Sequence, residues 1–154
     1  MTHRIAIGSR FRPRPRALAA LALLGAALAG PMGCRSVSDD SIRTVGLPEV
    51  QRPFQKQDDS VLFIDPRPAE AFAAARIPGA RNLRLPDIDI KDPDPALSRY
   101  KLLIVYGDNP GSSSARGMVK RLLTAGYKHA RLFPGGLDAW KASGMPIEGT
   151  DAPR

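Results

Sequence analysis

The chain has 154 residues, and its 23 Lys and Arg outnumber its 15 Asp and Glu to give a formal net charge of +8. Five of these arginines lie within residues 1–16, so the 18 basic residues that remain exceed the 15 acidic ones by 3. The remaining charges are interspersed and form no basic run, which excludes the pattern of a nucleic-acid-binding protein. The single cysteine, Cys34, excludes an intrachain disulfide. The stability of the fold must therefore come from a hydrophobic core.

The first 33 residues are typical of a secretory signal peptide. Residues 1–16 are basic and contain no acid, and Ala17–Ala29 is an uncharged run of Ala, Leu and a single Gly. Thirteen residues are too few to cross a bilayer as a helix, so this run indicates the apolar region of a signal peptide. An uncleaved interfacial helix is the alternative. The sequence therefore predicts export to the periplasm or the face of the cell envelope.

Two cleavage sites compete at the end of this segment. Ala27–Ala29 fits a site with small residues at its first and third positions, and cleavage there would release a soluble protein. Leu28–Cys34 resembles a bacterial lipobox, although Pro31 stands where an aliphatic residue is usual. The place of Cys34 close behind the apolar run favours lipidation, and a free thiol in a flexible stub is the alternative.

The predicted domain organisation follows from this cleavage. We expect a signal peptide over residues 1–33 and a lipidated, flexible tether over 34–41. The tether leads to one domain over 42–148, and residues 149–154 are expected to be a disordered tail.

In the first part of the domain, short apolar runs alternate with helical segments. Ile42–Val45 is a strand candidate, and Leu47–Phe54 can form a helix that Pro53 ends. Val61–Ile64 is a continuous apolar run between acidic residues, as in a strand that is buried on both faces. Pro68–Ala75 is rich in alanine and predicts a short helix.

The second part of the domain continues the alternation. Leu83 and Leu85 predict a short extended segment, and Pro86–Pro95 is a surface connection rich in Asp and Pro. Two further strands are expected at Leu102–Tyr106 and Ala130–Phe133, and two helices at 113–125 and Leu137–Ala142. Strands that alternate with helices predict an α/β fold, with a central, mostly parallel sheet and helices on both faces.

The loop after Leu102–Tyr106 is the candidate functional site. Ligands of parallel α/β sheets bind beyond the carboxyl ends of the strands, where this loop lies. Its Asn109–Ser112 segment fits a type II turn, and Ser112 or Ser113 is expected to cap the next helix. Such a layout points backbone N–H groups at one place, which is a ready site for an anion. The residues of the loop are Gly107, Asp108, Asn109, Pro110, Gly111, Ser112, Ser113 and Ser114.

Three segments between Ile42 and Ile147 together resemble the rhodanese-like family. Phe63–Arg67 resembles the family's strand that ends in Asp-x-Arg, and Arg76–Asn82 resembles its His-Ile-Pro-Gly-Ala-x-Asn turn. Phe133–Trp140 and the Gly-Met-Pro that follows resemble its closing Gly-Gly-x-x-x-Trp signature. The resemblance implies a rhodanese-like α/β fold. In active members it also implies sulfur transfer by a cysteine just after the central strand.

The loop of this chain contains no such cysteine. Gly107 matches the cysteine position best, and an alignment shifted by one or two residues places Asp108 or Asn109 there. Arg76 likewise stands where the family's turn has His. Sulfur transfer needs a thiolate, and a serine hydroxyl would need an adjacent base, whereas His129 lies beyond the next helix. Asp108 is expected to interact favourably with the positive end of that helix.

The family-motif residues have structural roles that need no catalysis. Gly79, Gly135 and Gly136 are expected to supply backbone conformations that other residues disfavour. Trp140 is expected to anchor the last helix in the core, and Arg67 to pair with Glu70. The motif residues are Asp65, Arg67, Arg76, Gly79, Gly135, Gly136 and Trp140.

These observations predict a binding or accessory module without intrinsic sulfurtransferase activity. We expect no catalytic residue, no cofactor and no metal ion. The expected partner is a protein or a small anion at the 107–114 loop, and lipidated Cys34 is expected to contact the membrane. A sulfurtransferase or sulfur-relay component with an atypical loop is the alternative. A phosphatase of related architecture meets the same obstacle, because that chemistry also uses the loop cysteine.

Overall fold

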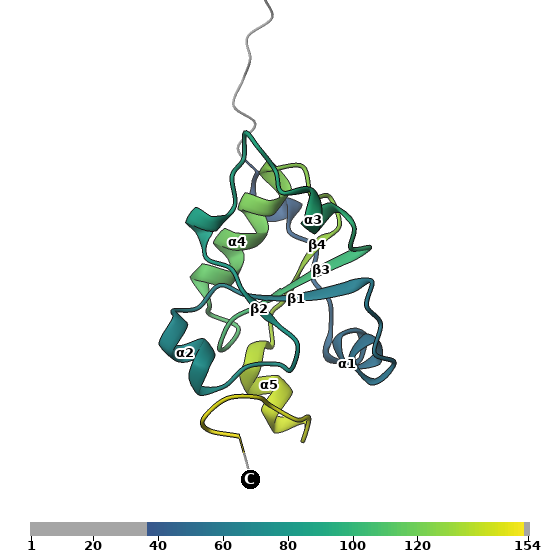
Figure 1. Cartoon of the computed structure of the whole chain (residues 1–154), viewed down its shortest axis with the longest axis vertical. Helices are drawn as coiled ribbons and strands as arrows, with labels where there is room; N and C mark the ends of the chain where they lie inside the picture. The colour runs from purple at the N-terminus through teal and green to yellow at the C-terminus, as the bar shows by residue number, and fades with distance from the viewer. Residues whose placement is uncertain (1–36, 153–154) are drawn as a thin grey trace, which may run out of the picture. The chain divides into compact units, whose positions relative to one another are not determined.

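A computed structural model of the chain describes residues 37–152 (Figure 1). The expected signal peptide, Cys34 and the start of the expected tether lie outside the described residues. Within residues 37–152, no helix is both long enough and apolar enough to cross a membrane.

A four-stranded parallel sheet forms the centre of the domain, in the order β2-β1-β3-β4. The strands are β1 (Val61–Asp65), β2 (Arg81–Asn82), β3 (Leu102–Tyr106) and β4 (Ala130–Phe133). The two long apolar runs of the sequence are the neighbouring central strands, where both faces are covered. The predicted α/β fold with a parallel sheet is therefore confirmed.

Helices cover both faces of this sheet, as Figure 1 shows. Leu62 and Ile64 of β1 pack in the core beneath α4 (Ser113–Thr124) and α3 (Pro95–Ser98). Phe63 lies on the other face, with α1 (Leu47–Gln55) and α5 (Gly136–Ala142). The alternation of side chains along a strand divides the core into these two layers. The short α2 (Ala69–Ala74) follows β1, and the 3₁₀ turns lie at Asp39–Ser41 and Leu85–Asp87.

Three local predictions were wrong. Ile42–Val45 is not a strand, although Thr44 forms a single parallel bridge with Leu132 of β4. Pro53 lies inside α1 and does not end it; a proline removes one helical hydrogen bond, and the chain remains helical to Gln55. The extended segment expected at Leu83 and Leu85 is instead β2, two residues earlier, because Leu85 begins a 3₁₀ turn with Pro86 at its second position.

Both ends of the described chain contact the domain. Asp39, in the expected tether, forms an ion pair of 2.8 Å with Lys120 of α4. At the other end, the Thr150 and Asp151 amides donate hydrogen bonds to the carbonyls of Ala73 and Ala74. Residues 150 and 151 of the expected tail therefore lie against α2, and its last two residues lie outside the described residues.

Candidate functional site

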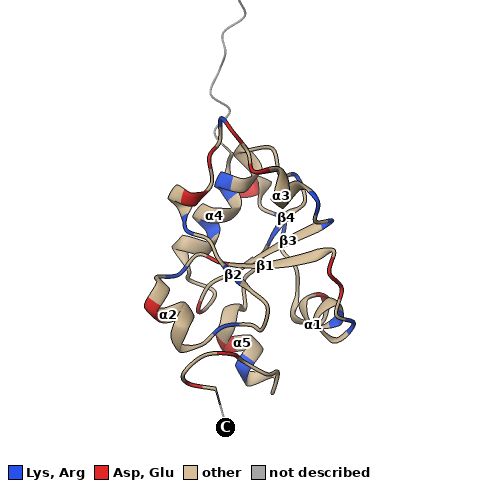
Figure 2. Cartoon of the chain, in the orientation of Figure 1, with Lys and Arg blue, Asp and Glu red and all other residues tan. Residues whose placement is uncertain are grey.

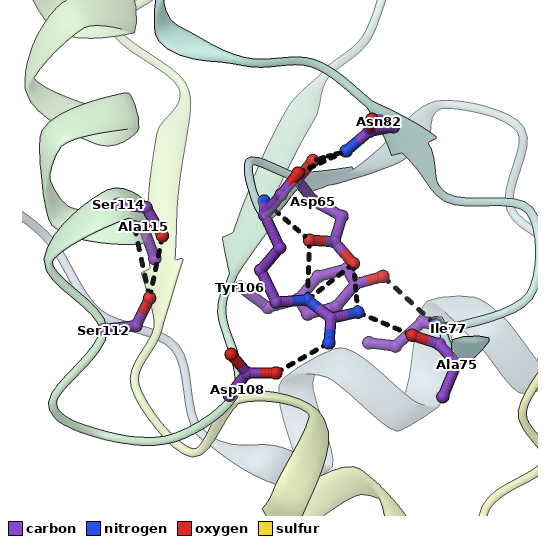
Figure 3. A network of polar contacts seen from close by, with 10 residues as sticks. Asp65, Ala75, Ile77, Asn82, Tyr106, Asp108, Ser112, Ser114 and Ala115 are labelled. Carbon is purple, nitrogen blue, oxygen red and sulfur yellow. Dashed lines mark hydrogen bonds and ion pairs between the residues drawn. The ribbon is translucent and has the colours of Figure 1, made fainter. Parts of the chain in front are cut away.

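The carboxyl ends of β1 and β3 bring a set of polar side chains together (Figure 3). Asp65 is the last residue of β1, and Arg67 follows it by two positions. Tyr106 ends the neighbouring strand β3, so the loop that begins with Gly107 leaves the sheet beside these residues. The candidate loop therefore lies where the sequence placed it, at the carboxyl edge of the sheet.

The Arg67 guanidinium is the centre of this set. Its Nε donates hydrogen bonds of 2.9 and 3.2 Å to the two oxygens of Asp65, and its Nη2 lies 2.6 Å from one of them. Nη2 also donates to the carbonyl of Ala75 at 2.6 Å. Nη1 reaches across to the loop and lies 2.6 Å from a carboxylate oxygen of Asp108. Arg67 therefore joins β1, the end of α2 and the loop after β3.

This network is buried at one end and open at the other. Asp65 and Arg67 are 0% and 4% exposed, whereas the Asp108 side chain is 58% exposed. Burial acts to lower the pKa of Arg67, but hydrogen bonding to Asp65 and its charge, and then those of Asp108, outweigh burial and raise that pKa. Arg67 is thus held in its charged form between two carboxylates.

Two expectations for these residues were wrong. Arg67 pairs with Asp65 and Asp108, not with Glu70, because the guanidinium turns inward beside Asp65. The Asp108 carboxylate likewise contacts the Arg67 side chain instead of the first turn of α4. Asp108 therefore acts as the outer end of a buried ion-pair network.

Two further residues of the network were missed in the sequence. The Tyr106 hydroxyl accepts a hydrogen bond from the Ile77 amide at 3.1 Å, and burial, followed by the charge of Asp65, raises the pKa of this tyrosine. The Asn82 side-chain amide donates to the carbonyls of Asp65 and Arg67, at 2.9 and 2.8 Å. A tyrosine that ends an otherwise aliphatic strand was the available signal for the first of them.

The loop itself begins with a tight turn at Asn109–Ser112. The Ser112 amide donates to the Asn109 carbonyl at 3.1 Å, which closes the turn, and the Gly111 amide donates to the Asn109 side chain at 3.0 Å. Gly111 lacks the positive φ that a type II turn requires, so the turn is present but the predicted type was wrong. The Ser112 hydroxyl then accepts a bond from the Ala115 amide at 3.4 Å and caps α4.

The Ser112 side chain also fills the space directly above Gly107. A Cβ atom at position 107 would lie 2.0 Å from the Ser112 Oγ and 2.4 Å from its Cβ, closer than such atoms approach in proteins. The hydroxyl is held there by the Ala115 amide and by the Ser114 hydroxyl, 3.1 Å away (Figure 3). Any residue other than glycine at position 107 would therefore require Ser112 to move.

The first turn of α5 fixes the loop from the other side. The amides of Leu137 and Asp138 donate to the carbonyls of Gly107 and Asp108, at 2.8 and 2.9 Å. Gly136 has a φ of +61°, and a Cβ there would lie 2.6 Å from the Asp108 carbonyl oxygen. The paired glycine of the closing signature thus permits a close backbone approach.

The other motif residues have structural contacts. Gly79 has a positive φ of 75°, as expected, whereas Gly135 is right-handed and is needed because a Cβ there would lie 2.7 Å from Ala139. Trp140 is fully buried and packs edge-on against Phe54, with 5.1 Å between the ring centroids, which confirms its role as a core anchor. Arg76 forms an ion pair of 3.2 Å with Glu148.

The site offers charge and backbone dipoles more than a nucleophile. His129 immediately precedes β4, at the opposite end of the strands from the loop, so it cannot activate Ser112, Ser113 or Ser114. Among residues 37–152, no group of three or more His, Cys, Asp or Glu is arranged to hold a metal ion. The exposed part of the loop carries the Asp108 carboxylate, and Ser112 caps the N-terminal turn of α4.

Comparison with solved structures supports the fold. A Bacillus halodurans protein matches with a TM-score of 0.64 and 22% identity, over 71% of this chain and 79% of that chain. The rhodanese-like domain of an Anabaena protein matches with a TM-score of 0.56 and 25% identity, over 70% and 80%. A thiosulfate sulfurtransferase from Pseudomonas aeruginosa matches with a TM-score of 0.55 and 18% identity, over 75% and 22%.

The family follows from the sequence match together with this architecture. The family model described as the rhodanese-like domain matches residues 48–143, which include all of α1 except its first residue, the whole sheet, the loop and α5. With its parallel sheet, its Asp65–Arg67 pair and its Gly135–Gly136 turn, the chain belongs to the rhodanese-like domain family.

Proposed function

We propose that this chain is an exported, membrane-tethered rhodanese-like domain that binds a partner through the 107–114 loop and does not itself transfer sulfur. The observation that carries the proposal is the close contact between Gly107 and the Ser112 side chain. The loop contains no thiol, and the Ser112 side chain occupies the space that a side chain at position 107 would need. Without a thiolate, sulfane sulfur has no group in the loop on which to form a persulfide.

The charges around the 107–114 loop favour a protein partner over a small anion. Asp108 is more than half exposed, so its carboxylate would repel an anion that approaches the loop. The positive charge of Arg67 is already matched by Asp65 and Asp108, so it offers little attraction to an anion. A partner that presents N–H donors or a positive side chain to Asp108 fits this arrangement better.

Sulfur transfer should be absent from the purified full-length protein. Incubation with thiosulfate and cyanide should form thiocyanate no faster than the blank, since the loop has no thiolate. Intact-mass measurement after thiosulfate treatment should show no added sulfur atom on residues 35–154. Turnover above the blank, with a sulfur atom gained inside that range, would overturn the proposal in favour of a sulfurtransferase with an atypical loop. Sulfur found on a co-purified protein alone would identify the accessory role.

Membrane attachment should depend on Cys34. Lipidation of this residue would add acyl chains worth about 0.8 kcal/mol for each buried CH₂, so Cys34→Ser should move the protein from the membrane fraction to the soluble fraction. The measurement is fractionation of the producing cells, with Ser36→Ala as the matched control that should stay with the membrane. If Cys34→Ser remains membrane-bound, the apolar run Ala17–Ala29 is the anchor and lipidation is not.

A further inference from the structure

A groove runs along the edge of the sheet, near the amino end of β1 and away from the 107–114 loop. Its volume is about 750 Å³. The end of α1 and the turn that follows it form one wall, with Phe54 as its aromatic residue. The Pro78–Gly79 turn and the segment with Tyr100 line the remainder, and Val61–Phe63 of β1 lie along the groove.

The short β2 leaves part of this edge open. β2 pairs with β1 at two positions, Ile64 with Arg81 and Asp65 with Asn82. Among residues 37–152, no strand pairs with Val61–Phe63 on that side of β1. In Figure 1, β1 accordingly extends past β2 in the direction of α1.

The hydrogen bonds that β1 makes with β3 and β2 indicate which of its backbone groups face the groove. The Ser60 carbonyl accepts from β3, and the Asp65 carbonyl accepts from the Leu83 amide on the β2 side. Backbone groups alternate between the two neighbours along a strand of a parallel sheet, so the Phe63 amide and the Val61 carbonyl point toward the groove. In a parallel strand one added residue can pair with both of them, and in an antiparallel strand two residues that lie two positions apart can do so.

The walls of the groove favour a single extended peptide over a folded domain as the binding partner. A second copy of this chain that docked through the same edge would have to fit its own α1 and Pro78–Gly79 turn against these walls. A single extended peptide has no such elements to fit. This geometry is that of strand addition, in which main-chain bonds supply affinity and side-chain pockets supply selectivity.

Charge at the two ends gives the chemistry of that peptide. Asp58 and Asp59 line the groove just before β1, Arg99 lines it on the wall that carries Tyr100, and Arg81 lines it level with Ile64. At about 3.3 Å per residue, the span from Asp59 to Ile64 matches a peptide of about five residues. We propose that the groove binds an extended segment of a partner protein, apolar at its centre, with a basic residue beside Asp58–Asp59 and an acidic residue beside Arg81.

The experiment uses full-length protein labelled with ¹⁵N and two blocked peptides, Lys-Val-Leu-Val-Glu and its reverse, which cover both strand directions. At millimolar concentration, at least one should produce saturable shifts of the Val61–Phe63 amides and leave the amides of the 107–114 loop unchanged. Methylation of the central backbone nitrogens should abolish the shifts, because it removes the donors. This test is independent of the function proposed for the loop.

A charge exchange tests the orientation. Asp59→Lys should weaken binding of the peptide by about twofold to fivefold, the range expected for an exposed ion pair, and replacement of the peptide lysine by glutamate should restore it. Absence of saturable shifts at Val61–Phe63 with both peptides would overturn the proposal. A concentration-dependent dimer that protects the same amides would also overturn it, and would assign the groove to a second copy of the chain.

Discussion

Replacement of Arg67 by methionine should lower the free energy of unfolding by about 3–5 kcal/mol, the usual cost of removing one partner of a buried ion pair. The Asp65 carboxylate is fully buried and takes hydrogen bonds from Nε and Nη2 of Arg67. Methionine matches the length of the side chain and supplies none of these donors, so a charge would remain in the core without a counter-charge. Urea denaturation of the full-length protein, followed by circular dichroism, measures the loss.

Arg76→Met is the matched control. Arg76 pairs with Glu148, but both side chains are partly exposed, so this variant should lie within about 1 kcal/mol of the parent. The double variant Asp65→Asn/Arg67→Met removes the buried charge altogether and should be more stable than Arg67→Met alone. If Arg67→Met and Arg76→Met unfold at the same urea concentration, the Asp65–Arg67 pair contributes no more than a surface ion pair.

Introduction of a cysteine at position 107 should succeed only together with removal of the Ser112 side chain. Gly107→Cys alone should cost about 1–3 kcal/mol, because its Cβ would collide with Ser112. In Gly107→Cys/Ser112→Gly the space is vacated, and the thiol lies beside the N-terminal turn of α4. We expect its pKa to fall below the ordinary value of about 8.5. The pH dependence of alkylation by iodoacetamide, in a Cys34→Ser background, measures that pKa.

Ser112→Gly by itself is the control for the lost helix cap and should cost only a few tenths of a kcal/mol. A Gly107→Cys variant as stable as the parent would contradict the steric argument. An ordinary thiol pKa in the double variant would show that the loop no longer directs N–H groups at position 107. The double variant also separates the two obstacles to sulfur transfer, the absent thiol and the occupied space.

The sheet could be predicted well because its strands are buried on both faces. Leu102–Tyr106 and Ala130–Phe133 were predicted with the bounds that the structure has, since each is a short apolar run between polar residues. The prediction failed for β2, because its two residues, Arg81 and Asn82, are paired by backbone bonds and carry no apolar pattern. A strand of that length depends on the neighbouring β1 rather than on its own sequence.

The candidate site could be located but not assembled from the sequence. Local spacing favoured Glu70 as the partner of Arg67, whereas the structure pairs Arg67 with the buried Asp65. The contact between Arg67 and Asp108 joins residues 41 positions apart, so no local pattern reports it. The pairing of Gly107 with Ser112 depends on how sharply the loop turns, which the glycine and proline content alone does not determine.

The two hydrogen bonds from α5 to the loop couple distant parts of the chain. The amides of Leu137 and Asp138 hold the carbonyls of Gly107 and Asp108, and the indole of Trp140 in the same helix donates to the Pro146 carbonyl at 2.7 Å. The 107–114 loop is therefore held by α5, and α5 is in turn bonded to the C-terminal segment at Pro146. A protease cut or a fused tag near Pro146 should therefore weaken the hold of α5 on the 107–114 loop, although it contacts no residue of that loop. A ligand bound to the loop should in turn protect the segment near Pro146 from digestion.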